Sequence, residues 1–254
     1  CVGFVKIGGR VFRCANRYGH GELDVRRAIA VSCNPYFIEI GQRTGYEPLV
    51  YDNCRQLGLG ESPAIGIPTA SGLLPSSGWK RTRHGDSWRA GDTANFSMGQ
   101  GFISASPLQI ALVTASIATD GKVLQPRLIR DARDGLGAKD WLEVRSKMNW
   151  SKRNLEVVKS GMYDAVNEAY GTARRSRLPG VSAAGKTGTA EYYEDGERKK
   201  LAWMITFAPF DSPRYALAVV AEDSDAGGQT AAGIVREIMY ELFESEVNSA
   251  IERG

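Results

Sequence analysis

The chain has 254 residues, of which 43% are hydrophobic and 24% are charged, so it has the composition of a globular protein with a substantial core. Its formal net charge of +3 is small, and no block of Lys/Arg indicates a nucleic-acid partner. The longest apolar stretch, Leu201 to Phe210, is about half the roughly 20 residues that a membrane-spanning helix needs. No signal peptide opens the chain, and its first residue is Cys1 rather than Met. We therefore expect the later part of a longer protein, with no membrane segment in this chain.

The first elements in the chain are predicted to be a short hairpin and two helices. Residues 1–20 alternate in the manner of a β-hairpin, with the turn between Lys6 and Arg10. Apolar residues at helical spacing then predict a helix over Ala28 to Gly45. A second helix is expected over Glu47 to Leu57. Residues 58–95 carry much of the Gly, Pro and Ser, which favours a long loop.

Two further helices follow this expected loop. One is predicted over Ser106 to Thr119, with Ser106 as its N-cap and Pro107 at the first helical position. The other, over Ser151 to Tyr170, has the clearest amphipathic pattern of the chain. We interpret residues 1–175 as a mostly helical lobe.

From Val181 onward the hydrophobic period becomes that of β-strands. Strands are expected at Lys186–Tyr193, Leu201–Pro209 and Arg214–Glu222, with Asp195-Gly196 at a hairpin tip, and a closing helix at Thr230 to Phe243. Residues 176–254 are thus predicted to be the sheet portion. Helices followed by an antiparallel meander and a last helix indicate an α+β protein, in which helices flank an antiparallel sheet.

The most informative motif is Lys186-Thr187-Gly188-Thr189, at the start of a predicted strand and flanked by small residues. Small residues allow a substrate to pair with the strand through its main chain. Lys186 offers a charge for a carboxylate, and Thr187 and Thr189 offer hydroxyls for it. Gly188 removes a side chain where a substrate backbone passes closest, and the Thr189 amide is a donor for a developing oxyanion. The alternative is an ordinary edge strand with a solvated lysine.

A second motif, Ser32-Cys33-Asn34, lies within the first predicted helix. Ser and Asn are good helix caps, which is the simplest explanation of both residues. In the functional interpretation, Ser32 relays a proton and the Asn34 amide binds the substrate backbone. A serine beside a partly desolvated lysine can replace a Ser–His pair in nucleophilic catalysis.

Four segments occur in an order that is typical of one family. They are Ala30 to Phe37 (AVSCNPYF), Gly91 to Gly101 (GDTANFSMGQG), Ser106 to Gln109 (SPLQ) and Gly185 to Glu191 (GKTGTAE). Over Cys1 to Phe243 the chain resembles the transpeptidase domain of a class B penicillin-binding protein. Trp79, Lys80 and Trp88 resemble the elongation (rod-shape) type more than the division type.

The resemblance implies the fold shared by penicillin-binding proteins and serine β-lactamases. It also implies a peptidoglycan D,D-transpeptidase that joins stem peptides through an acyl-enzyme and is a target of β-lactams. In that enzyme Ser32, Asn34 and Lys186 are catalytic, and Thr187, Gly188 and Thr189 bind substrate. The implied partners are the D-Ala-D-Ala stem peptide, β-lactams and rod-type cell-wall synthesis proteins. The implied location is extracytoplasmic (periplasmic), in a protein anchored in the cytoplasmic membrane.

The nucleophilic Ser-x-x-Lys of the family is expected upstream of Ser32, before Cys1. Ser77 to Lys80 matches the pattern, but it follows Ser32 and falls in the predicted loop, so we interpret it as a chance match. This leaves a non-catalytic module that recognises stem peptide as the alternative function. A β-lactamase has little support, because no residue is identified for activating a deacylating water. A Ser-x-x-Lys within about 60 residues upstream would favour the enzyme.

The last candidate site is a set of metal-binding residues: Cys1, Cys14, His20 and Cys33, spaced 13, 6 and 13 residues apart. Three Cys and one His suit a structural zinc ion. The spacing matches no standard zinc motif. A Cys1–Cys14 disulfide and buried free thiols stay open as alternatives. No cofactor is expected for catalysis itself.

Overall fold

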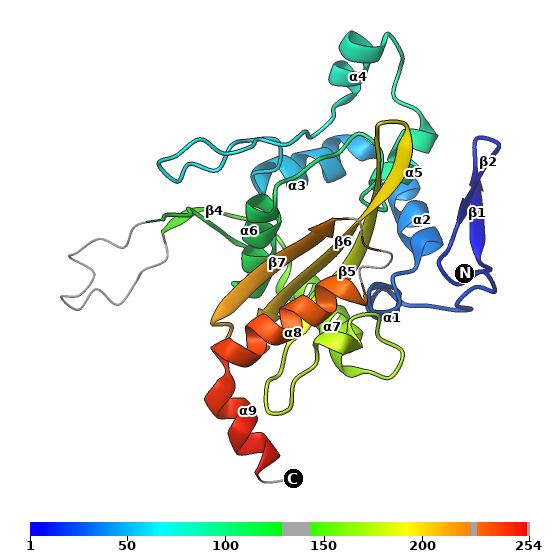
Figure 1. Ribbon diagram of the computed structural model, residues 1–254. Helices are drawn as coiled ribbons and strands as arrows, with labels where there is room; N and C mark the ends of the chain where they lie inside the picture. The colour runs from blue at the N-terminus through cyan, green and yellow to red at the C-terminus, as the bar shows by residue number, and fades with distance from the viewer. Residues whose placement is uncertain (129–142, 223, 225–227, 253–254) are drawn as a thin grey trace.

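The computed structural model describes residues 1–128, 143–222, 224 and 228–252. Its central element is an antiparallel sheet of β5 (Ala184–Glu194), β6 (Glu197–Ala208) and β7 (Tyr215–Glu222), in the order β5-β6-β7 (Figure 1). The hairpin turn between β5 and β6 lies at Asp195 and Gly196, as predicted. With helices on both faces of this sheet, the α+β class is confirmed.

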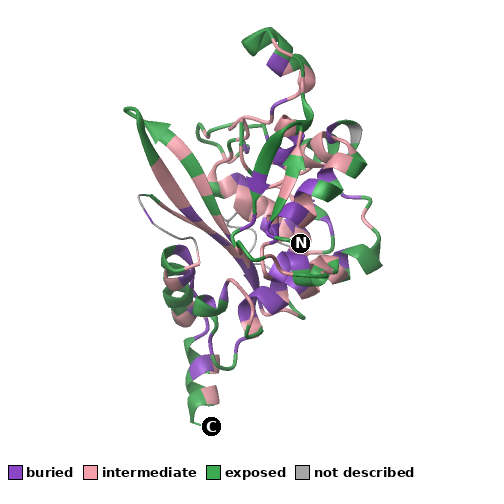
Figure 2. Cartoon of the chain, turned by 90° about the vertical axis from the view of Figure 1, so that its right-hand side faces the viewer, coloured by how far each residue is buried: buried purple, intermediate pink, exposed green. Residues whose placement is uncertain are grey.

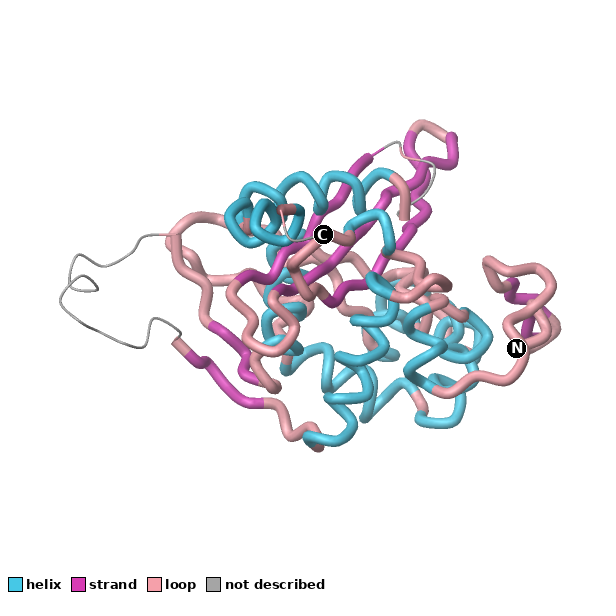
Figure 3. Tube along the Cα trace, turned by 90° about the horizontal axis from the view of Figure 1, so that it is seen from below, coloured by secondary structure: helices cyan, strands magenta, loops and turns pink. Residues whose placement is uncertain are grey.

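Helices cover both faces of the central sheet because the side chains of β6 alternate between them. Ala202 and Met204 pack on one face with α8 (Thr230–Leu242), in a core that includes Val235. Phe207 packs on the other face with residues of α1 (Val25–Ala30), α6 (Pro107–Ala118) and α7 (Lys152–Asn167). Seen from below, the strands run between these two helical layers (Figure 3).

The helices predicted near Ser106 and Ser151 are confirmed. Ser106 caps α6, because its hydroxyl accepts from the backbone amide of Gln109. The Gln109 side-chain oxygen in turn accepts from the backbone amide of Ser106, so both hydrogen bonds of a capping box are made. Ser151 caps α7 in the same way, by accepting from Asn154. The closing helix α8 also has the predicted bounds to within one residue.

The single helix predicted over residues 28–45 is wrong. The structure divides this segment into α1 and α2 (Asn34–Thr44), with a turn at Val31 to Cys33 between them. Ser32 has φ 54, in the left-handed region, which a helix cannot include. Pro35 lacks an amide hydrogen, so it fits the first turn of a new helix and not the interior of a long one. The motif residue Ser32 therefore sits at a chain reversal rather than on a helix face.

The loop predicted over residues 58–95 is also wrong in part. It contains α4 (Ser77–His84), capped by Ser76, and α5 (Ala90–Phe96), capped at Arg89 by the Asp92 side chain. Both helices are short and carry Gly, which hides them from a periodicity argument. The remaining elements are β1 (Phe4–Ile7), β2 (Arg10–Arg13), η1 (Tyr46–Val50), α3 (Tyr51–Gln56), β3 (Lys122–Leu124), β4 (Val144–Lys147), η3 (Arg174–Ser176) and α9 (Glu244–Ile251).

The tip of the β5–β6 hairpin extends beyond the helical layers and is exposed, whereas the other end of the sheet is buried (Figure 2). This difference places the predicted Lys-Thr-Gly motif in the half of β5 that lies against the body of the protein. Across the described residues, every helix falls short of the length and apolarity needed to span a bilayer.

Candidate active site

The Ser32 turn is held by backbone hydrogen bonds to the end of α1. The Ser32 amide donates to Ile29 O at 3.2 Å, and the Cys33 amide donates to Ala28 O at 3.0 Å. A non-glycine residue in the left-handed region costs of order 1 kcal/mol or more, and such positions concentrate at functional sites. The turn points the Ser32 side chain at the central sheet, where it meets Lys186.

The Lys-Thr-Gly segment lies on β5, which is an edge of the three-stranded sheet. Gly185 is required by packing, because a Cβ there would lie 2.6 Å from Ile205 O. Gly188 is different, since its nearest neighbour would be the Trp203 Cβ at 3.4 Å. The protein's own packing thus tolerates more at Gly188 than at Gly185, and the missing side chain leaves the strand open for a substrate backbone.

Lys186 joins the two motifs. Its Nζ donates to Ser32 Oγ at 2.8 Å and to Thr187 O at 2.6 Å. The burial of this side chain lowers the pKa of Lys186 from 10.5 to about 8. In the part of the chain that the structure describes, no carboxylate lies within ion-pair distance of it. Next to a serine hydroxyl, the site therefore holds a partly buried cation that has no ion-pair partner among the described residues, which suits an anionic substrate group.

The other predicted site residues have partners within the chain. The Thr187 side chain is 8% exposed and donates to the Thr172 hydroxyl at 3.0 Å. The Asn34 side-chain amide donates to Arg13 O, on β2, at 3.1 Å. Thr189 accepts at its carbonyl oxygen from the Gln100 side chain at 2.8 Å. The structure thus brings Ser32, Lys186 and Thr187 into one hydrogen-bonded group, with Gly188 and Thr189 following on the strand, whereas the Asn34 side chain bonds to β2 instead.

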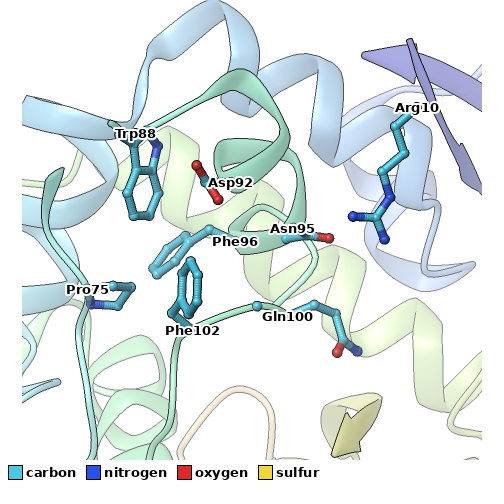
Figure 4. Close-up of a pocket in the computed structure, with 9 residues that line it drawn as sticks. Arg10, Pro75, Trp88, Asp92, Asn95, Phe96, Gln100 and Phe102 are labelled. Carbon is cyan, nitrogen blue, oxygen red and sulfur yellow. The ribbon is translucent and has the colours of Figure 1, made fainter. Parts of the chain in front are cut away.

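Gln100 also borders a cavity of about 260 Å³ between the first hairpin and the segment around α5. Figure 4 shows the rings of Trp88, Phe96 and Phe102 on one side of this cavity and Arg10 on the other. Gln100 lies in the segment GDTANFSMGQG, but the sequence alone predicts no role for it. Its contact with Thr189 spans 89 residues, and no local pattern encodes such a contact.

Ser77 and Lys80, the formal Ser-x-x-Lys match, are on helix α4 and not in a loop. The Ser77 hydroxyl donates to Glu47, whereas Lys80 is buried and its Nζ donates to Asp92 at 2.5 Å and to Ser87 O. Each side chain is thus committed to a different partner. Figure 1 shows α4 at one extremity of the molecule, away from α1.

The four predicted metal-binding residues converge beside the same turn. The ligand atoms of Cys1, Cys14, His20 and Cys33 all lie within 4.8 Å of one another. All four cysteines of the chain, including Cys54, are free thiols here. Around a tetrahedral zinc ion with Zn–S of 2.3 Å, ligand atoms are roughly 3.5–3.8 Å apart, so a small contraction would suit this cluster to zinc. Burial lowers the pKa of His20, a direction that favours the neutral imidazole, the form that binds metals.

Two glycines bring the ends of the cluster together. Gly3 and Gly19 have φ of 90° and 84°, and a Cβ at Gly3 would lie 2.3 Å from Arg17 O, while one at Gly19 would lie 2.3 Å from Cys1 O. The His20 amide then donates to Cys1 O at 3.1 Å. Cys33 is fully buried between Ser32 and Asn34. A metal ion at this cluster would therefore fix the hairpin region to the turn that carries Ser32.

Comparisons with known proteins identify the family. A model of the penicillin-binding protein transpeptidase domain matches residues 5–240. The chain is 31% identical to the peptidoglycan D,D-transpeptidase MrdA of Haemophilus influenzae, over 90% of this chain and 37% of that protein. It is 28% identical to the stage V sporulation protein D of Bacillus subtilis, over 93% of this chain and 36% of that protein.

Two solved structures are similar in sequence and fold. One is penicillin-binding protein 2 of Pseudomonas aeruginosa in complex with WCK 5153, with a TM-score of 0.83 and 29% identity over 95% of this chain and 54% of that chain. The other is a complex of penicillin-binding protein 2 with MreC from Helicobacter pylori, with a TM-score of 0.80 and 30% identity over 94% of this chain and 44% of that chain.

The chain belongs to the penicillin-binding protein transpeptidase family. The prevalence of MrdA and penicillin-binding protein 2 among these matches agrees with the predicted resemblance to the elongation type. The chain spans little more than a third of the length of the curated relatives it matches.

Proposed function

We propose that this chain is the larger part of the transpeptidase domain of a peptidoglycan D,D-transpeptidase. The observation that carries the proposal is the 2.8 Å bond from Lys186 Nζ to Ser32 Oγ, between motifs that lie 154 residues apart in the sequence. Lys186 has no carboxylate within ion-pair distance among the residues that the structure describes, so its cation suits the terminal carboxylate of a D-Ala-D-Ala stem peptide. It suits the carboxylate of a β-lactam for the same reason.

The reaction assigns a distinct role to each side chain. A serine supplied by the segment upstream of Cys1 attacks the carbonyl carbon between the two D-Ala residues. The peptide bond breaks, and the proton lost by the attacking serine hydroxyl passes through Ser32 to the departing D-Ala amine. The Thr189 amide is offered as a donor to the oxyanion, while Asn34 binds the substrate backbone. An amine from a neighbouring stem peptide then attacks the ester, which releases the serine and forms the cross-link.

The partners and location belong to the same proposal. The parent protein acts outside the cytoplasmic membrane, where peptidoglycan is cross-linked, from an anchor outside this chain. Its association with rod-type cell-wall synthesis proteins is supported by the Helicobacter pylori complex with MreC. A complex described as coordinating polymerization and crosslinking by a peptidoglycan synthase, 32% identical over 94% of this chain, adds to that support.

A structural zinc ion at Cys1, Cys14, His20 and Cys33 is a further part of the proposal. Its support is the convergence of four soft or borderline ligands within 4.8 Å. The metal would replace the four side chains' separate packing with one cross-link beside Ser32. Zinc supplies no chemistry to the acyl transfer in this proposal. Its role is to hold the start of α2, and hence Ser32 and Asn34, in position.

The first experiment is covalent labelling with a fluorescent penicillin. This chain alone should remain unlabelled after denaturation, because the serine that forms the acyl-enzyme is proposed to lie upstream of Cys1. The full-length parent should be labelled once per molecule. Denaturation-resistant label on Ser77 would overturn our interpretation of that match. An unlabelled parent that still binds stem peptide would support the non-catalytic module.

The acylation rate of the parent should depend on pH through Lys186. Because burial lowers the pKa of Lys186 to about 8, the cation prevails below that pH and is lost as the pH rises through it. The rate constant for acylation by a penicillin should therefore fall above pH 8, approaching tenfold per pH unit. The Lys186→Arg variant keeps its charge and should show no such decline below pH 10. A flat wild-type profile from pH 7 to 9.5 would remove the cation from the mechanism.

A further inference from the structure

We propose that Thr172 is a positioning residue for the acylation reaction, and this inference rests on the function proposed above. Thr172 lies in the loop that follows α7, outside every motif singled out in the sequence. Its hydroxyl accepts from Thr187 Oγ1 at 3.0 Å and donates to Ala30 O at 3.3 Å. Its backbone amide donates to the same Ala30 oxygen at 3.2 Å. One residue thus touches both the Lys-Thr-Gly strand and the helix that ends at the Ser32 turn.

These contacts of Thr172 help to fix the position of Lys186 relative to Ser32. Ala30 is the last residue of α1, two residues before Ser32. Thr187 directly follows Lys186 on β5. A second link therefore runs beside the Lys186–Ser32 bond of 2.8 Å. It joins the neighbour of Lys186 to a residue near Ser32 through the Thr172 hydroxyl. A displacement of about 1 Å in a reacting group can lower a rate by about a hundredfold, so a link of this kind acts on the rate without touching substrate.

The loop that carries Thr172 is itself fixed to α7. A Cβ at Gly171 would lie 2.2 Å from Ala165 O, so the loop passes directly against the helix backbone. On either side of Thr172, the Gly171 amide donates to Glu168 O at 3.0 Å and the Ala173 amide donates to Ala165 O at 2.8 Å. The position of Thr172 is thus set by α7. Through its hydrogen bonds, Thr172 in turn connects the strand and the end of α1 to this helix.

The same helix also holds α1 through a buried carboxylate. Asp164 on α7 is 2% exposed and accepts both the Nε and the Nη2 of Arg26, at 2.6 and 2.7 Å. The Tyr170 hydroxyl adds a bond to Asp164 at 3.3 Å. The ion pair holds the first turn of α1, which contains Arg26. Thr172 instead contacts the last residue of the same helix, close to Ser32. Removing the Thr172 hydroxyl should therefore leave α1 docked and loosen only the strand-to-turn link.

A threonine hydroxyl is suited to this position because it accepts one hydrogen bond and donates another. Thr172→Val keeps the shape and loses both bonds, whereas Thr172→Ser keeps both. The backbone bond from Thr172 to Ala30 is unaffected by either change. Thr119 provides the matched control. It directly follows α6, and its hydroxyl donates at 2.8 Å to Ala115 O in that helix, away from the site.

The test measures acylation of the full-length parent by a penicillin at several concentrations, which separates binding from the acylation rate constant. Thr172→Val should lower the acylation rate constant about tenfold and leave penicillin binding within twofold, while Thr172→Ser and Thr119→Val stay within twofold of wild type. Because Thr172 acts through Thr187, adding Thr172→Val to Thr187→Val should slow acylation by less than twofold further. If Thr172→Val does not fold, Thr172→Ala makes the same comparison with no added bulk.

Wild-type rates in Thr172→Val or Thr172→Ala would overturn the inference, as would equal losses in the serine and valine variants. Fully multiplicative effects in the Thr172/Thr187 double variant would overturn it as well. A wild-type parent that forms no acyl-enzyme at all is a different outcome, because it would overturn the proposed function and this inference with it.

Discussion

Replacing Lys186 with alanine in the full-length parent should slow its acylation by a penicillin about ten- to a hundredfold or more. The substitution removes the cation that donates to Ser32 at 2.8 Å and that is free of any carboxylate among the described residues. Hydrogen bonds to charged groups contribute roughly 1.5–3 kcal/mol, which corresponds to this range of rates. The measurement is the second-order rate constant from stopped acylation reactions resolved by mass spectrometry.

Two controls make this result specific to the site. Lys80→Ala removes a buried lysine on α4, which is paired with Asp92 on α5. This variant should lose stability and keep its acylation rate at temperatures where it is folded. Lys186→Arg should retain part of the activity, because the charge stays but the geometry of the ammonium is lost. An unchanged rate in Lys186→Ala would exclude Lys186 from the site.

Removing zinc from the parent should destabilise it strongly. A ligand that binds only the folded state contributes about 4 kcal/mol when it is present at a thousand times its Kd. For unfolding of a domain of this size each kcal/mol shifts the Tm by roughly 2–4 °C, so His20→Ala should lower the Tm of the transpeptidase domain in the parent by roughly 8–16 °C. Penicillin acylation should weaken in parallel, because Cys33 lies between Ser32 and Asn34 at the start of α2.

The metal content decides whether this loss of stability comes from zinc. Protein purified without added metal should contain about one zinc ion per chain by mass spectrometry, and the His20→Ala variant should contain none. Cys54→Ala is the matched control, because this thiol lies outside the cluster and its removal should leave the zinc in place. Protein without zinc, in which thiol counting finds Cys1 and Cys14 as a disulfide, would contradict the zinc proposal.

Much of the fold was predictable because local signals coincide with the elements. The caps Ser106 and Ser151 mark the starts of α6 and α7, and the Asp195-Gly196 pair marks the β5–β6 turn. The predicted strand Leu201–Pro209 coincides with the apolar part of β6, whose side chains pack on both faces of the sheet. Where the signals are weak, as in the polar and fully exposed β4 (Val144–Lys147), no strand was predicted.

The break at Ser32 shows why local signals fail at the site. Helical spacing of apolar residues continues from Ala28 to Ile40, yet the helix is interrupted where Ser32 has a positive φ and Cys33 is extended. A backbone conformation of this kind is supported by tertiary contacts, here from Lys186 to Ser32 and from Thr172 to Ala30, that sequence spacing does not contain. The motifs of the proposed site could therefore be found in the sequence, whereas the shape of the Ser32 turn could not.

Thr172 and Gln100 illustrate the same limit among the residues that support the site. Each contacts the Lys-Thr-Gly strand from a loop, over 15 and 89 residues of sequence. Neither residue type nor spacing distinguishes them from other threonines and glutamines of the chain. In contrast, the four residues of the proposed zinc site could be selected from their chemistry alone, because the residue types that bind zinc are few.

The most direct test of the central claim is the release of D-Ala by the purified full-length parent. The substrate is peptidoglycan that carries stem peptides ending in D-Ala-D-Ala, and the products are separated and weighed by mass spectrometry. The proposed function predicts one D-Ala released for each cross-linked dimer formed, with both products abolished by penicillin and strongly reduced in Lys186→Ala. Saturable binding of the stem peptide with neither D-Ala release nor dimer formation would contradict it and would identify a non-catalytic module instead.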